Sequence, residues 1–228
     1  MSRTKNSIRN ISFGFLNRIE AIIIPFLFRT LIIKILGEEY LGLGTLFSSI
    51  LQVLNVAELG FSNAITAALY KPISENDIDM VNALLCMYRR IYTIIGCFCL
   101  CMGFGLLPFL DKLIRGFPPE GINIYVLFIV YLCNTVISYF FYAYKVTLIN
   151  AYQRMDLTEK VGALSKLLIT GVQLITIIVL KNIILYTLCN VICTLIYNLG
   201  CSYIADKYFP QYTYQGYLEC SRKLTNKS

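Results

Sequence analysis

Basic side chains in and beside long apolar runs are the residues of this sequence best suited to chemistry. Arg18 and Arg29 lie in the first run, Arg89 stands at the start of the third, and Lys145 lies in the fourth. A guanidinium can hold two phosphate oxygens at once, and an ammonium adds a compact positive charge. These four side chains, if they meet in one cavity, would form a binding site for an anionic group.

Uncharged polar residues repeat at helical spacing within the same apolar runs. Such a stripe shares one face of a helix, and that face contacts protein or water because contact with lipid is costly. The sequence therefore predicts a wet cavity between helices, with more cations than anions on its wall. Its predicted polar lining consists of Gln52, Asn55, Ser62, Asn134, Ser138, Asn190 and Asn198.

Each of these residues also has a purely structural interpretation. Ser and Thr hydroxyls often bond back to their own helix, and Asn or Gln can join two helices without a ligand. Glu58 can form an internal ion pair with one of the basic residues, and Lys145 or Arg29 can extend to a membrane interface. Topology alone is enough to explain Arg89. The occurrence of several stripes together favours the cavity.

The runs that carry these residues are long enough to cross a bilayer. Hydrophobic residues make up 57% of the 228 residues and charged residues only 14%, whereas a soluble domain has about 25% charged residues. About 20 apolar residues suffice for one span. We expect an all-α membrane protein in which residues 1–205 form a six-helix transmembrane bundle and residues 206–228 form a cytoplasmic tail or linker. The six helices are expected at 11–36, 41–70, 88–110, 122–151, 157–180 and 183–205.

Charge and composition exclude several classes of function. Lys and Arg in the short connections fall mostly on the side that holds both ends, which predicts cytoplasmic termini and explains the net charge of +7 without nucleic acid. The absence of histidine excludes Ser/His/Asp catalysis and imidazole metal sites. The nine cysteines include no CxxC pair and are interpreted as small buried residues. We therefore predict no enzyme activity, cofactor or metal.

A membrane-bound glycosyltransferase remains an alternative because Asp77-Ile78-Asp79 has the DxD form used for metal-bound sugar nucleotides. The motif lies in a short loop, however, and the sequence offers no extramembrane domain to hold a nucleotide. A polar helix start is the structural interpretation of the same residues.

Two stretches of the sequence resemble a known family. The first runs from Arg29 to Gly96 and includes "ILGEEYLGLGTLFSSILQVLNVAELGFSNAI", "LYKP" and "YRRIYTIIG"; the second is "SYFFYAYKVTLINAYQ", residues 138–153. Both look like the amino-terminal half of oligosaccharide flippases, the polysaccharide-transport branch of the multidrug/oligosaccharidyl-lipid/polysaccharide exporter superfamily. The chain departs from the family pattern after "YLGL", where Gly44 and Thr45 replace Asn-Gly.

The resemblance implies one lobe of a two-lobed exporter fold in a bacterial cytoplasmic membrane. It implies transfer of a polyprenyl-diphosphate-linked oligosaccharide for cell-surface polysaccharide, without ATP hydrolysis. The diphosphate would contact Arg18, Arg29, Lys145 and Arg89, and Glu58 would couple transport to a proton or sodium ion. Further partners would be a second six-helix lobe or polysaccharide-assembly proteins. A cation-coupled multidrug exporter of the same superfamily and an inactive fragment or scaffold remain alternatives.

Overall fold

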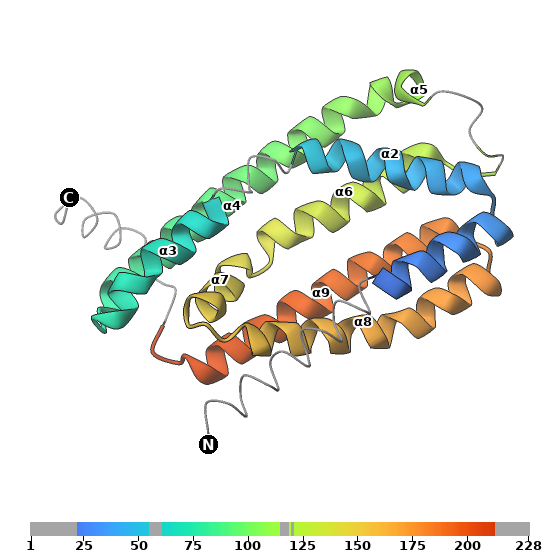
Figure 1. Cartoon of the computed structure of the whole chain (residues 1–228). Helices are drawn as coiled ribbons and strands as arrows, with labels where there is room; N and C mark the ends of the chain where they lie inside the picture. Colours follow the sequence, from blue (N-terminus) through green and yellow to red (C-terminus); the bar gives the residue numbers. More distant parts are fainter. Residues whose placement is uncertain (1–21, 55–60, 115–118, 120, 213–228) are drawn as a thin grey trace.

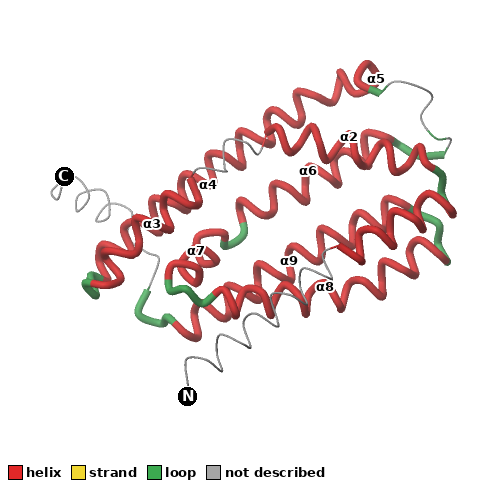
Figure 2. The backbone as a smooth tube through the Cα atoms, viewed as in Figure 1, coloured by secondary structure: helices red, strands yellow, loops and turns green. Residues whose placement is uncertain are grey.

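The structure is a computed structural model that describes residues 22–54, 61–114, 119 and 121–212. This part of the chain is built from helices joined by short turns and contains no strand, which confirms the all-α prediction (Figures 1 and 2). The first helical segment covers residues 22–35. It is followed by α2 (Glu38–Leu54), α3 (Phe61–Ser74), α4 (Ile78–Leu106), the 3-10 turn η2 (Leu107–Phe109), α5 (Leu110–Leu113), α6 (Ile124–Phe140), α7 (Ala143–Ala151), α8 (Met155–Ile178) and α9 (Ile183–Tyr208).

Capping side chains set where three of the long helices begin. Asp77 precedes α4 and accepts a hydrogen bond from the backbone N–H of Met80. Asn123 and Asn182 do the same for the first backbone N–H groups of α6 and α9. Such caps satisfy backbone donors that a helix leaves unpaired at its start. The Asp77-Ile78-Asp79 motif is therefore part of a helix start, and α4 begins ten residues before the expected position 88.

The helices pack side by side as an elongated bundle (Figure 1). α8 packs on α9, α9 on α6, and α6 on α4. α2 contacts α6 and α4, while α3 lies against α4 and α7. Fully buried aromatic and aliphatic side chains fill the interior, and Phe47 of α2 meets Phe128 of α6 edge to face at 5.2 Å between ring centroids.

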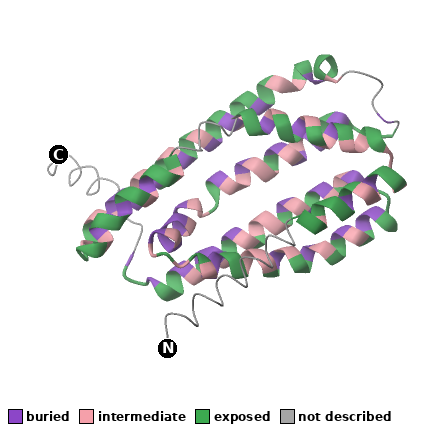
Figure 3. Ribbon diagram, in the orientation of Figure 1, coloured by how far each residue is buried: buried purple, intermediate pink, exposed green. Residues whose placement is uncertain are grey.

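Several helices are long and apolar enough to cross a membrane. In the described part of the chain they are Ile78–Leu113, Met155–Ile178 and Ile183–Tyr208, and α6 with α7 adds a fourth if this bent pair is one span. Their outward side chains are apolar and exposed, as on α8, where Leu164, Leu167 and Leu168 are each about 60% exposed (Figure 3). The expected helices 11–36 and 41–70 include residues outside the described ranges. The described residues contain three or four helices that could span a membrane, where the sequence predicts six.

The expected helix 122–151 is broken in the middle. α6 ends at Phe140, Tyr142 adopts the left-handed conformation with φ 62° and ψ 19°, and α7 leaves at a 52° bend. A left-handed backbone is unfavourable for a bulky residue and here marks the corner between the two helices. The bend rotates Lys145 of α7 away from the polar face of α6 on which Asn134 lies.

The end of α9 also differs from expectation. The helix continues to Tyr208, three residues beyond the predicted end of the bundle at 205, and Phe209 and Tyr212 are buried. Tyr152 stacks on Phe209 at 4.3 Å between ring centroids and shares a 2.6 Å hydrogen bond with the hydroxyl of Tyr212. Burial, and secondly this hydrogen bond, raise the pKa of Tyr212, so the phenol stays protonated at neutral pH. The first residues of the predicted tail are therefore part of the packed bundle.

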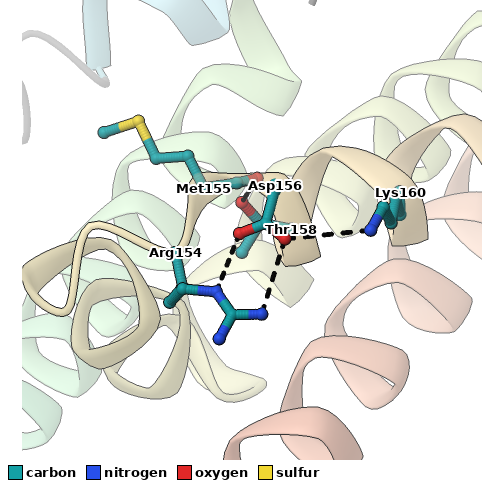
Figure 4. A network of polar contacts seen from close by, with 5 residues as sticks. All are labelled: Arg154, Met155, Asp156, Thr158 and Lys160. Carbon is teal, nitrogen blue, oxygen red and sulfur yellow. Dashed lines mark hydrogen bonds and ion pairs between the residues drawn. The ribbon is translucent and has the colours of Figure 1, made fainter. Parts of the chain in front are cut away.

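A carboxylate anchors the start of α8 (Figure 4). The Asp156 side chain is only 9% exposed and lies 2.9 Å from Nε of Arg154 and 3.8 Å from Nζ of Lys160. The Arg154 guanidinium also lies over the ring of Tyr208, 5.4 Å from its centroid. Because this carboxylate is buried, charged and at a helix start, it stabilises the junction between α7, α8 and α9.

Replacing Asp156 with asparagine is expected to lower the free energy of unfolding by about 1–2 kcal/mol, because the buried charge-assisted bonds to Arg154 are lost. Lys160→Gln removes the longer contact, which comes from an exposed lysine, and should cost about 0.5 kcal/mol or less. Thermal unfolding of the purified protein in detergent measures both. Equal effects of the two substitutions would contradict the assignment of Asp156 as the anchor.

Candidate functional site

A polar cavity of about 450 Å³ lies between α2, α6 and α9. Side chains with hydroxyl or amide groups predominate on its wall, and no carboxylate, lysine or arginine is among the described residues that line it. The lining residues are Ser48, Leu51, Gln52, Tyr131, Asn134, Thr135, Tyr186, Thr187, Asn190, Cys193 and Thr194. The cavity can therefore exchange many hydrogen bonds with an uncharged polar ligand.

Helical spacing explains why these residues share a cavity. α9 presents Tyr186, Asn190 and Thr194 at intervals of four residues, so they lie on neighbouring turns of one face. α6 contributes Asn134 from the facing side, and α2 contributes the exposed Gln52. Three of the predicted lining residues, Gln52, Asn134 and Asn190, are thus brought together.

Hydrogen bonds hold the base of the cavity in place across three helices. The Thr194 hydroxyl lies 2.8 Å from Asn134 Oδ1 on α6 and 3.1 Å from the carbonyl oxygen of Asn190. The amide of Gln173 on α8 donates to Asn190 Oδ1 at 2.9 Å. A network in which each member has a partner fixes side-chain orientation before any ligand arrives. By contrast, Gln52 is exposed in the cavity and is available to a ligand.

Among the described residues, Arg29 is the predicted cation that lies next to this cavity. It lines an adjoining cavity of about 360 Å³ that shares Ser48, Gln52, Tyr131 and Tyr186 with the first. α2 lies close to α6 here: a Cβ at Gly44 would lie 2.7 Å from the Tyr131 hydroxyl, so a larger residue at this position would require the Tyr131 side chain to shift. Gly44 itself lines this adjoining cavity.

Lys145 does not join the cavity. Its ammonium is bound by both carboxylate oxygens of Asp206, each at 2.7 Å, and by the hydroxyl of Ser202 at 2.9 Å. It also lies 4.9 Å from the centroid of the Tyr142 ring. The break after α6 turns this lysine toward the end of α9, where it forms an internal ion pair instead of a ligand contact.

The remaining predicted residues are dispersed. Arg89 is exposed on α4, with its guanidinium 5.8 Å from the centroid of the Tyr144 ring, and does not line the cavity. Ser138 donates to the carbonyl oxygen of Thr135 in its own helix at 2.6 Å. Ser62 on α3 and the buried Asn198 on α9 also lie outside the lining. The other predicted residues, Arg18, Asn55 and Glu58, lie outside the described residues.

Sequence reasoning missed Lys166 and Gln173 on α8. Both line a third cavity of about 320 Å³, which shares Tyr186, Asn190, Cys193 and Thr194 with the polar cavity. The sequence already contains the pattern: Gly162, Lys166, Ile169 and Gln173 follow one another at intervals of four, three and four residues. Residues at this spacing share one face of a helix. Two cavities that share residues with the polar cavity thus contain one cation each, Arg29 in one and Lys166 in the other.

Within the described ranges, no group of three or more His, Cys, Asp or Glu side chains is placed to hold a metal ion. Comparisons with protein-family models, with curated proteins and with solved structures found no match.

Proposed function

We propose that this chain transfers an oligosaccharide linked to a polyprenyl diphosphate across a bacterial cytoplasmic membrane for cell-surface polysaccharide synthesis. The observation that carries the proposal is the polar, uncharged cavity between α2, α6 and α9. A sugar presents hydroxyl groups that both donate and accept hydrogen bonds, and Asn, Gln, Ser, Thr and Tyr side chains match both requirements. Within membrane-crossing helices such polar groups need a polar partner.

The cations beside the cavity suit the charged part of the same substrate. Arg29 lies in the adjoining cavity and Lys166 in the third, so an anionic group would meet a positive charge in either cavity next to the sugar site. An inside-negative membrane potential assists an outgoing anion by about 2.3 kcal/mol per charge per 100 mV. Arg18 and Glu58 keep their proposed roles in anion binding and in coupling to a proton or sodium ion.

Completion of the site requires a second polar surface. Gln52, Ser48 and Ser49 are exposed on α2, and side chains of this kind are unfavourable against lipid. We therefore propose six spans that form one lobe, covered on this face by a second lobe or by polysaccharide-assembly proteins, with both termini in the cytoplasm. A multidrug exporter for cationic compounds receives less support, because no carboxylate is among the described residues that line the three cavities.

The double substitution Ser48→Ala/Gln52→Leu tests the proposed function. Both side chains are exposed in the cavity, so their removal should leave the bundle folded while it removes hydrogen bonds to the sugar. Two lost hydrogen bonds correspond to a decrease in export of about tenfold or more. Surface polysaccharide is measured in a bacterium whose own exporter gene has been deleted, together with the amount of protein in the membrane.

Thr93→Val is the matched control, because Thr93 is exposed on α4 and donates to the carbonyl oxygen of Arg89 in its own helix. This variant should export normally. Full export by Ser48→Ala/Gln52→Leu at normal abundance would refute the role of the cavity. Failure of the unaltered chain, with or without a co-expressed second lobe, would refute the transport function.

A further inference from the structure

Lys166 is a basic residue near the middle of α8, one of the helices that is long and apolar enough to cross a membrane. Within the described residues no carboxylate lies within 4.0 Å of its ammonium. A charged side chain at this depth is costly in lipid and is expected to serve a function. Lys166 differs in this respect from Lys145, whose charge is balanced by Asp206.

The cavity beside Lys166 has an amphipathic wall. It measures about 320 Å³ and lies between the helical segment 22–35, α8 and α9. Ile24, Phe28 and Ile169 supply apolar surface, whereas Gln173 and Asn190 supply hydrogen-bonding groups. Its ligand should therefore combine an apolar part with a polar, anionic group.

The positions next to the lining residues show from which side such a ligand arrives. Phe26 and Leu27 on segment 22–35, and Leu167 and Leu168 on α8, are all more than half exposed and apolar. Exposed apolar side chains of this kind suit contact with the lipid of a bilayer. The cavity is therefore placed for entry from the membrane plane.

We propose that this cavity binds the phosphate-bearing headgroup of an anionic lipid that enters between segment 22–35 and α8, with Lys166 as the phosphate-binding residue. The ammonium contacts the phosphate, Gln173 and Ser165 lie within the same cavity, and the lipid chain stays along the apolar mouth. The identity of the natural lipid rests on the proposed function. A lipid-linked oligosaccharide held here would place its sugar in the adjoining polar cavity, which shares Asn190, Cys193 and Thr194 with the lipid cavity.

Lipid selectivity of the purified full chain tests this proposal without an export assay. The protein is placed in phosphatidylcholine nanodiscs with increasing amounts of phosphatidylglycerol, and the fraction of spin-labelled lipid immobilised on the protein is measured for each headgroup. We expect a preference for phosphatidylglycerol that falls about fivefold in Lys166→Gln and by about twofold or less in Lys166→Arg, because one phosphate contact depends on this charge. Lys181→Gln removes an exposed charge between α8 and α9 and should leave the preference unchanged.

A second variant tests whether the lipid preference needs the open volume of the cavity as well as the charge of Lys166. A Cβ at Gly162 would meet Tyr197 only at an ordinary 3.6 Å, so Gly162→Leu should fold while its side chain fills the cavity, and it too should lower the preference. An unchanged preference in Lys166→Gln, or an equal loss in Lys181→Gln, would overturn the proposal. Displacement of the labelled lipid by millimolar inorganic phosphate would overturn the assignment to a lipid. Intact lipid selectivity combined with failed export would refute the flippase function alone.

Discussion

Replacing Asp206 with alanine is expected to destabilise the protein by about 3 kcal/mol, because a buried ammonium then loses its counter-charge. The Lys145 side chain is only 7% exposed, whereas that of Asp206 is 54% exposed. Lys145→Met leaves a carboxylate that water can solvate, and it should therefore cost about 1 kcal/mol or less. The effect of breaking this ion pair thus depends strongly on which partner is removed.

Unfolding by heat or by sodium dodecyl sulfate in mixed micelles at neutral pH measures both variants. The double variant Lys145→Met/Asp206→Ala is the control, and it should be close to Lys145→Met because no buried charge remains in it. Similar losses for the two single variants would show that the ammonium reaches water through another route. Since Lys145 lies on α7 and Asp206 at the end of α9, a strong effect would also show that this pair holds the bent helix in place.

A valine at Gly103 is expected to lower the free energy of unfolding by about 2–3 kcal/mol through overpacking. A Cβ at this position of α4 would lie 2.5 Å from Cδ1 and 2.6 Å from Cδ2 of Leu132 on α6. Leu132 is only 1% exposed, so it has little room to move aside. The clash would separate α4 from α6, the helix that carries Tyr131 and Asn134 into the polar cavity.

Gly105→Val is a matched control in the same helix, since a Cβ at Gly105 would meet no atom within 4 Å. Both substitutions change backbone freedom similarly, so the difference between them isolates the contact with Leu132. Thermal unfolding in detergent should show the loss only for Gly103→Val. Equal midpoints for the two variants would contradict tight packing between α4 and α6.

Apolar length and capping residues made the last two helices predictable. α8 and α9 begin at Met155 and Ile183, and the sequence predicted starts at 157 and 183. The apolar run that forms α8 ends before Asn182, and the Asn182 side chain then caps the start of α9. The convergence of Gln52, Asn134 and Asn190 was also predictable, because side chains at helical spacing share one face and polar faces in lipid turn toward each other.

The position of Lys145 was not predictable from its spacing. The sequence around Tyr142 contains neither glycine nor proline, and an uninterrupted helix would place Lys145 on the same stripe as Asn134 and Ser138. Aromatic packing and the bonds from Lys145 to Ser202 and Asp206, more than 50 residues away, favour the bent conformation instead. Arg89, by contrast, is exposed on α4 eleven residues after the helix begins at Ile78, whereas the sequence predicted it at the helix start.

Composition and periodicity by themselves determined that this chain folds into helices long and apolar enough to cross a membrane, because each backbone polar group in lipid must be paired within its own helix. The tertiary structure decided which charges meet. Helical phase assigns a side chain to a face, but a 52° bend and contacts between distant segments decide what that face meets. For this reason Lys145 is paired with Asp206, and among the described residues Arg29 and Lys166 are the cations in the cavities that adjoin the polar cavity.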